Sequence, residues 1–232
     1  MWTKLSLKMT FTTPLCGGVP RSDDIVKRWC ELRAATPAAH EKLRGGLGPD
    51  NRMPQNLGAV AEEAVATIDP LDPADEMAKV WVGFSRDETG LFVRGANLRA
   101  HLKDCASVLG PRFKAGDFGG ARQIKLFKAK LADAVYIAQD RLYLRDETQR
   151  PITEASGFRD ATLSVMTALG PRTCLKRVDM CFPCTILATV QLLPGGEINR
   201  DHIVACLEYG KVHAFGQDRS LQYGRYDYEL GE

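Results

Sequence analysis

The chain has 232 residues, of which 44% are hydrophobic and 26% charged, with a formal net charge of +2. These values are typical of a folded protein with a buried core, and the 21 glycines follow no three-residue period, which excludes collagen. The longest apolar stretch, Cys184–Leu193, is too short for a bilayer span, so we expect no membrane partner. The N-terminus lacks a continuous apolar signal core, so we expect a cytoplasmic protein.

The first predicted element is a strand at residues 4–12, where polar and apolar side chains alternate. The apolar set on its one face is Leu5, Leu7, Met9 and Phe11. The Gly- and Pro-rich segment Thr13–Pro20 is not expected to continue a ladder. A helix capped by Ser22–Asp24 is predicted next, and then loop sequence from Thr36 to Gly58.

In the middle of the chain, strands are predicted at Lys79–Phe84 and Gly90–Val93 on either side of a turn. Asn97 is then expected to cap a helix with leucines at helical spacing. The glycines of Gly110–Arg122 favour a surface loop.

The last part of the chain is predicted to contain strands and one helix. The strands are expected at residues 135–137, 142–144, 161–169, 185–193 and 223–230. The helix begins at Asn199 or Asp201, and Gly210 suits its left-handed end.

This order favours an α+β fold with a ferredoxin-like or RRM-like βαββαβ core, an antiparallel sheet and large insertions. We expect a single domain over residues 1–232, with insertions at about 36–78 and 110–122.

The charges are segregated along the chain. Residues 60–90 contain eight acidic and two basic side chains, a local net charge of −6. Residues 94–130 contain nine basic and two acidic side chains, a local net charge of +7. Such a distribution suits a protein that holds a polyanion on one face, or one that pairs with copies of itself, while a simply solvated surface is the alternative.

Two glycine-containing segments carry the side chains expected for nucleic-acid binding. The candidate residues of the first are Arg94, Gly95, Asn97, Arg99 and Lys103, and those of the second are Phe215, Gly216, Arg219, Ser220, Tyr223, Gly224 and Arg225. The basic residues can meet phosphates, the glycines allow close approach, and Phe215 and Tyr223 can stack on bases. The alternatives are a turn with solvated arginines for the first segment and a packed hairpin for the second.

On these residues the chain resembles the RAMP superfamily, the RRM-like proteins of CRISPR effector complexes, and most closely its backbone subunits. The likeness covers Phe92–Arg99, Phe215–Tyr226 and the glycine-rich Thr13–Gly18. It implies an RNA-binding subunit of a CRISPR-type ribonucleoprotein that holds single-stranded RNA along a basic groove, namely guide RNA, with target RNA as a further option. The implied partners are that RNA, other protein subunits and copies of the chain itself.

The sequence departs from the family pattern at several positions. Arg94–Asn97 replaces the usual Pro-Gly-Ser-Ser turn, and Ala100 and Ala214 stand where the family has glycines. A stand-alone single-stranded nucleic-acid-binding or self-assembling protein of a phage or mobile element therefore remains an alternative.

Whether the protein is an enzyme is left open. Some backbone subunits of this family cut RNA with an aspartate after the first strand, and Asp23 and Asp24 occupy a comparable region. A carboxylate there could hold Mg²⁺ in a metal-dependent ribonuclease, whereas the competing interpretation is a helix cap. No other cofactor is expected. His101 is a further candidate, as a general base, without an evident partner.

The seven scattered cysteines indicate reduced thiols. Cys181 and Cys184 have CxxC spacing, but a fourth zinc ligand at suitable spacing is lacking, so we interpret them as buried thiols.

Overall fold

In the computed structural model, which describes residues 2–21, 81–112, 124–167 and 170–231, the chain begins with β1 (Thr3–Phe11). The predicted alternation is confirmed, because Leu5, Leu7, Met9 and Phe11 are each at most 3% exposed. The residues between them are exposed or half-buried, so one face of this strand faces the core and the other faces solvent.

β1 is a central strand of a four-stranded antiparallel sheet with the order β12-β1-β11-β7. Its partners are β7 (Val135–Ile137), β11 (Thr185–Leu192) and β12 (Tyr226–Gly231). Because β1 and β7 both run antiparallel to β11 between them, they are parallel to each other and form a split βαβ unit. The predicted α+β fold with an antiparallel sheet is confirmed, and its order is that of a ferredoxin-like core.

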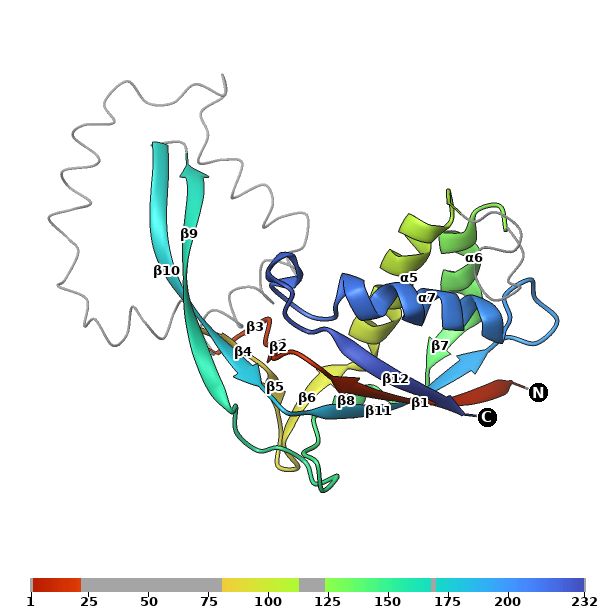
Figure 1. Cartoon of the computed structure of the whole chain (residues 1–232), viewed down its shortest axis with the longest axis horizontal. Helices are drawn as coiled ribbons and strands as arrows, with labels where there is room; N and C mark the ends of the chain where they lie inside the picture. The colour runs from red at the N-terminus through yellow and green to blue at the C-terminus, as the bar shows by residue number, and fades with distance from the viewer. Residues whose placement is uncertain (1, 22–80, 113–123, 168–169, 232) are drawn as a thin grey trace, which may run out of the picture. The chain divides into compact units, whose positions relative to one another are not determined.

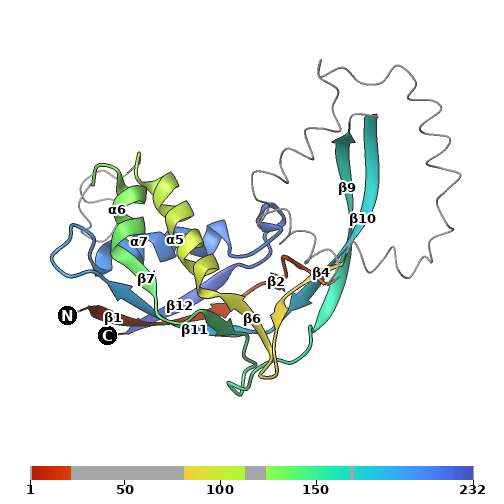
Figure 2. The same cartoon turned by 180° about the vertical axis from the view of Figure 1, so that it is seen from behind.

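Three helices cover one face of this sheet (Figures 1 and 2). They are α5 (Gly95–Leu109), α6 (Phe127–Ala134) and α7 (Arg200–His213). The leucines of α5 predicted at helical spacing are buried, and α5 packs against both α6 and α7. Apolar residues of the three helices and of β1 and β11 belong to one buried core cluster.

A smaller antiparallel sheet, β5-β6-β8, leads the chain into α5. It consists of β5 (Ser85–Arg86), β6 (Leu91–Arg94) and β8 (Arg141–Tyr143). Asp87 fastens the turn between β5 and β6 by accepting hydrogen bonds from the backbone of Thr89 and from Tyr143 Oη. The strands predicted at Gly90–Val93 and at residues 142–144 correspond to β6 and β8 with boundaries shifted by one residue, whereas β5 was not predicted.

The remaining strands form a sheet with the order β2-β10-β4-β3, with β9 paired to β10. They are β2 (Leu15–Cys16), β3 (Val19–Pro20), β4 (Trp81–Gly83), β9 (Gly157–Thr167) and β10 (Gly170–Cys181). The expectation that Thr13–Pro20 would not continue a ladder is wrong, because Leu15 pairs with Cys181 and Cys16 with Met180, and because β3 is a neighbour of β4 in the same sheet. The backbone N–H of Arg21 donates to the carbonyl of Trp81 at 2.9 Å.

Two predicted helix boundaries are wrong. The helix α5 begins at Gly95, so Asn97 lies in its first turn and Arg94 occupies the N-cap position without a side-chain hydrogen bond. The helix α7 is capped by Asn199 as predicted, but it continues past Gly210 to His213. Gly210 is needed inside the helix because a Cβ there would lie 2.1 Å from Tyr226 Oη.

By its internal contacts the chain divides into two compact units. The first contains Met1–Val19, Val82–Ala161 and Arg177–Glu232, and the second contains Pro20–Trp81 and Thr162–Lys176. The expected single domain with insertions stays a prediction, since residues 36–78 and most of residues 110–122 lie outside the described parts. In those described parts, the helices are too short or too polar to cross a bilayer.

Candidate functional site

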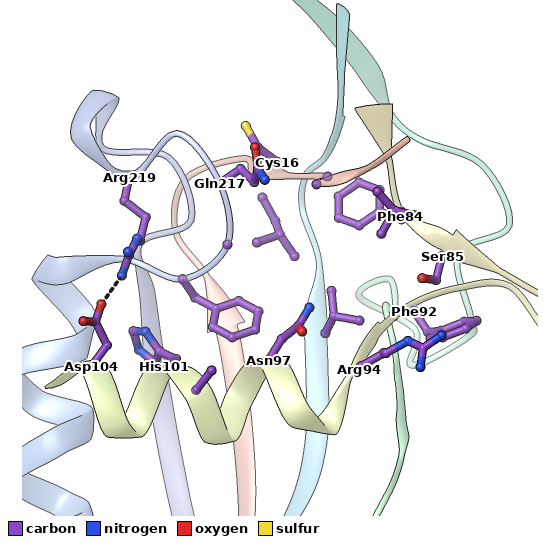
Figure 3. A pocket seen from close by; sticks show the side chains of 18 of the residues that line it. Cys16, Phe84, Ser85, Phe92, Arg94, Asn97, His101, Asp104, Gln217 and Arg219 are labelled. Atoms are coloured by element: carbon purple, nitrogen blue, oxygen red, sulfur yellow. Dashed lines mark hydrogen bonds and ion pairs between the residues drawn. The ribbon is translucent and has the colours of Figure 1, made fainter. Parts of the chain in front are cut away.

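A cleft of about 720 Å³ lies within the first unit and brings the two glycine-containing segments together (Figure 3). One wall comes from α5 and the end of β6, and another from the loop that follows α7. The remaining lining comes from residues 15–19 after β1, from residues 83–85 before β6 and from Lys128 of α6. Segments about 120 residues apart in sequence thus share one cavity.

The glycines after β2 let two backbones meet at the edge of this cleft. A Cβ on Gly17 would lie 2.3 Å from the carbonyl carbon of Gly83, so only glycine fits there. The Gly17 N–H also donates to the carbonyl of Asp179 at 2.9 Å. Residues 83–85, which lie against Gly17 and line the cleft, were not identified from the sequence as part of a site.

Basic side chains surround the cleft. The four that line it are Arg94, Lys103, Lys128 and Arg219, and Asp104 is the one carboxylate among its lining residues. Lys128 was not among the predicted site residues, although it lies in the basic block of the sequence. Such a surplus of positive charge favours an anionic ligand.

Asp104 and Arg219 form an ion pair across the cleft edge. Arg219 Nη1 lies 2.7 Å from Asp104 Oδ2, and His213 Nε2 lies 2.9 Å from the same oxygen. The hydrogen bond from Arg219, followed by that from His213, lowers the pKa of Asp104. Asp104 is therefore ionised at neutral pH and offsets part of the positive charge of Arg219.

The cleft includes only some of the predicted site residues. Those that line it are Arg94, Asn97, Lys103, Phe215, Gly216 and Arg219. Those that do not are Gly95, Arg99, Ser220, Tyr223, Gly224 and Arg225.

Arg99 and Gly95 make structural contacts elsewhere on α5. The Arg99 guanidinium lies 4.4 Å from the ring centre of Tyr136, and its Nη2 donates to the carbonyl of Ala132. Gly95 is buried, and a Cβ there would lie 2.1 Å from the carbonyl oxygen of Gln139. Both residues thus join α5 to α6 and to the turn after β7.

The loop after α7 is held by backbone contacts at its base. Phe215 and Gly224 are joined by a hydrogen bond of 2.8 Å, and Gly224 has a φ of +76°, in the left-handed region. The Phe215 ring is 2% exposed and packs against Phe11 and His101, which leaves little of its face for stacking on a base.

An arginine of β9 fastens the outer part of the same loop. Arg159 forms an ion pair of 2.6 Å with Asp218, and its guanidinium lies 5.2 Å from the ring centre of Tyr223. The backbone N–H of Arg225 donates to Thr13 Oγ1 at 2.8 Å. Tyr223 therefore contacts a protein side chain, although it was predicted as a ligand contact, whereas this hydrogen bond of Arg225 involves its backbone and not its guanidinium.

His101 has the partner that the sequence did not reveal. Its Nε2 lies 3.0 Å from Tyr226 Oη, and the residue is 5% exposed. Burial, followed by the charges of His213 and Arg219, lowers the pKa of His101 to about 3. An imidazole with this pKa is a weak base, so the geometry favours a structural role over general-base catalysis.

The remaining candidates for chemistry are of two kinds. Asp23 and Asp24 lie outside the described residues, so the predicted metal-dependent ribonuclease stays a prediction.

Cys181 and Cys184 are 0% and 2% exposed, and burial raises the pKa of Cys181 to about 12. Cys184 Sγ donates to the carbonyl of Cys181, as expected of protonated, buried thiols.

No family model and no curated protein matches the chain. Among solved structures, the chain is similar to a chain of the Type III-B Cmr-beta complex bound to cognate target RNA, with 10% identity and a TM-score of 0.42. That match covers 100% of this chain and 61% of the other, so the chain spans less than two thirds of that protein. A second match is a chain of a Type IV-B CRISPR complex, with 8% identity, a TM-score of 0.43, and coverage of 98% and 90%. Both TM-scores are below 0.5, so the functional proposal rests on the chain's own residues.

Proposed function

We propose that the protein binds single-stranded RNA in the cleft, as a RAMP-like subunit of a CRISPR-type ribonucleoprotein complex. The observation that carries the proposal is the convergence of the two glycine-containing segments on one cavity edged by Arg94, Lys103, Lys128 and Arg219. A phosphate backbone is the anion that contacts several separated cations at once. From the resemblance to RAMP backbone subunits we infer three kinds of partner, namely guide RNA, other protein subunits and neighbouring copies of this chain.

The composition of the cleft lining also favours RNA over a small anion. Within the cleft, the four cations come from β6, from α5, from α6 and from the loop after α7. A small anion would contact one or two of them, whereas an extended strand can pass all four. Affinity for such a strand comes largely from counterion release and falls as salt increases.

The test is a salt titration of binding to labelled single-stranded RNA. We expect Lys103→Ala with Lys128→Ala to weaken binding and to reduce the slope of log K against log salt by about 0.7 for each phosphate that the variant no longer neutralises. Lys125→Ala is the matched control, because Lys125 is also exposed and lies close to Lys128 in the chain but does not line the cleft. Equal affinity and slope in the wild type, the double variant and the control would contradict the proposal.

A further inference from the structure

The cleft has an apolar interior inside its basic edge. The apolar residues that line it are Leu15, Val19, Phe84, Phe92, Val93, Ala100 and Phe215. A cavity for phosphate alone would not need such a lining, because a phosphate is hydrated and charged. A nucleotide combines a flat, weakly polar base with a charged phosphate, and this matches an apolar cavity with cations around it.

Asn97 places an amide inside this apolar lining. It is exposed in the first turn of α5, and its side chain points into the cleft (Figure 3). The Asn97 amide makes no hydrogen bond within the described part of the chain. Asn97 also does not cap the helix, because the N-cap residue of α5 is Arg94. The amide therefore has both a donor and an acceptor available to a ligand.

Phe84 supplies an aromatic surface near that amide. It lies between β4 and β5, is half-buried against the core, and faces the cleft (Figure 3). The preceding residue, Gly83, lies close to Gly17, and the Phe84 side chain packs against the core cluster. An aromatic ring at the wall of a cleft is a surface on which a nucleobase can stack.

We propose that the cleft holds one adenine base of the bound strand, stacked on Phe84 and read by the amide of Asn97. An amide can accept a hydrogen bond from the adenine N6 amino group and donate one to the neighbouring ring nitrogen. The sugar and phosphate then lie toward the cations at the edge of the cleft. This inference rests on the proposed function, since it assumes that RNA occupies the cleft.

The experiment compares binding of labelled oligoadenylate and oligouridylate RNA of equal length. The wild type is expected to prefer oligoadenylate. Asn97→Ala is expected to reduce that preference by about fivefold or more, the lower limit for removing a bidentate interaction with a base. Asn97→Asp is a second variant of nearly the same size that lacks the amide donor and adds a negative charge, so it is expected to weaken binding of both RNAs and to reduce the preference for oligoadenylate.

Ala96→Ser is the matched control, because Ala96 is exposed in the same turn of α5 but does not line the cleft. It is expected to keep the wild-type preference. If the wild type binds both RNAs and Asn97→Ala leaves their affinity ratio unchanged, or weakens both equally, the base site is overturned while the proposed function stands. If the wild type binds neither RNA, the proposed function fails and this inference fails with it.

Discussion

The buried imidazole of His101 makes the stability of the protein depend on pH. Its pKa in the folded state is about 3, against an ordinary value of 6.5, because burial disfavours its charged form. The unfolded chain therefore binds a proton more readily than the folded chain. The stability that this residue contributes is fully present above about pH 6.5 and is lost as the pH falls toward about 3.

The magnitude follows from the difference between the two pKa values. Each pH unit below the unfolded pKa removes about 1.4 kcal/mol from the free energy of unfolding, as long as the folded imidazole stays neutral. Between about pH 7 and about pH 5 the contribution of His101 therefore falls by about 2 kcal/mol. This range lies well above the folded pKa, so the folded imidazole is neutral throughout it.

The assay is urea-induced unfolding of the wild type and of His101→Gln at both pH values. Glutamine keeps a terminal group that can bond to Tyr226 Oη but does not titrate, and every other ionisable group is common to the two proteins. We expect the wild type to lose about 2 kcal/mol more than the variant on acidification. Equal losses in the two proteins, or a His101 resonance that titrates near its ordinary value in an NMR experiment, would refute the reasoning.

Two further predictions follow from contacts at Gly210 and Asp104. Gly210→Ala is expected to reduce the free energy of unfolding by about 1–3 kcal/mol, because the new Cβ would lie 2.1 Å from Tyr226 Oη. Thermal unfolding measures this loss of stability. The control is Gly157→Ala, because a Cβ at Gly157 meets nothing within 4 Å. Asp104→Asn is expected to tighten RNA binding by up to about fivefold, because it frees Arg219 from an exposed ion pair. Weaker binding by that variant, measured by RNA titration, would show that Asp104 does not compete with the ligand.

The sequence predicted the core elements where one physical signal was strong. The period-two pattern of β1 was reliable because only one face of its sheet is covered, so burial and sequence alternate together. The spacing of Leu98, Leu102 and Leu109 likewise identified the buried face of α5. Both signals arise within a single element, without any partner.

The elements that were missed depend on their partners. The strand β10 contains Lys176, Arg177 and Asp179 within a few residues, which hides any apolar alternation, and its pairing with β2 and β9 makes it a strand. The helix α6 was missed because it has only eight residues and follows Leu126, which has a left-handed φ of 57° and no side-chain cap. Neither feature is visible in a propensity scale.

The site was predicted in part, for a geometric reason. Residues three and four apart on a helix share a face, so Asn97, His101 and Asp104 all line the cleft. Arg99 follows Asn97 by two residues, about 200° around the helix, and this spacing could have excluded it. Phe84 and Lys128 gave no comparable signal, because their places depend on the packing of Gly17 against Gly83 and on α6.

The hydrogen bond between Arg21 and Trp81 joins two parts of the backbone that are far apart in the sequence. Since the backbone is joined at these two points, the chain departs from the sheet and rejoins it at adjacent positions. The entropy cost of closing a segment grows only with the logarithm of its length, about 0.6 kcal/mol per doubling for a flexible chain. On this scale, bringing Arg21 and Trp81 together costs little more than closing a segment half as long, so β3 and β4 can be neighbours in one sheet although they are far apart in the sequence.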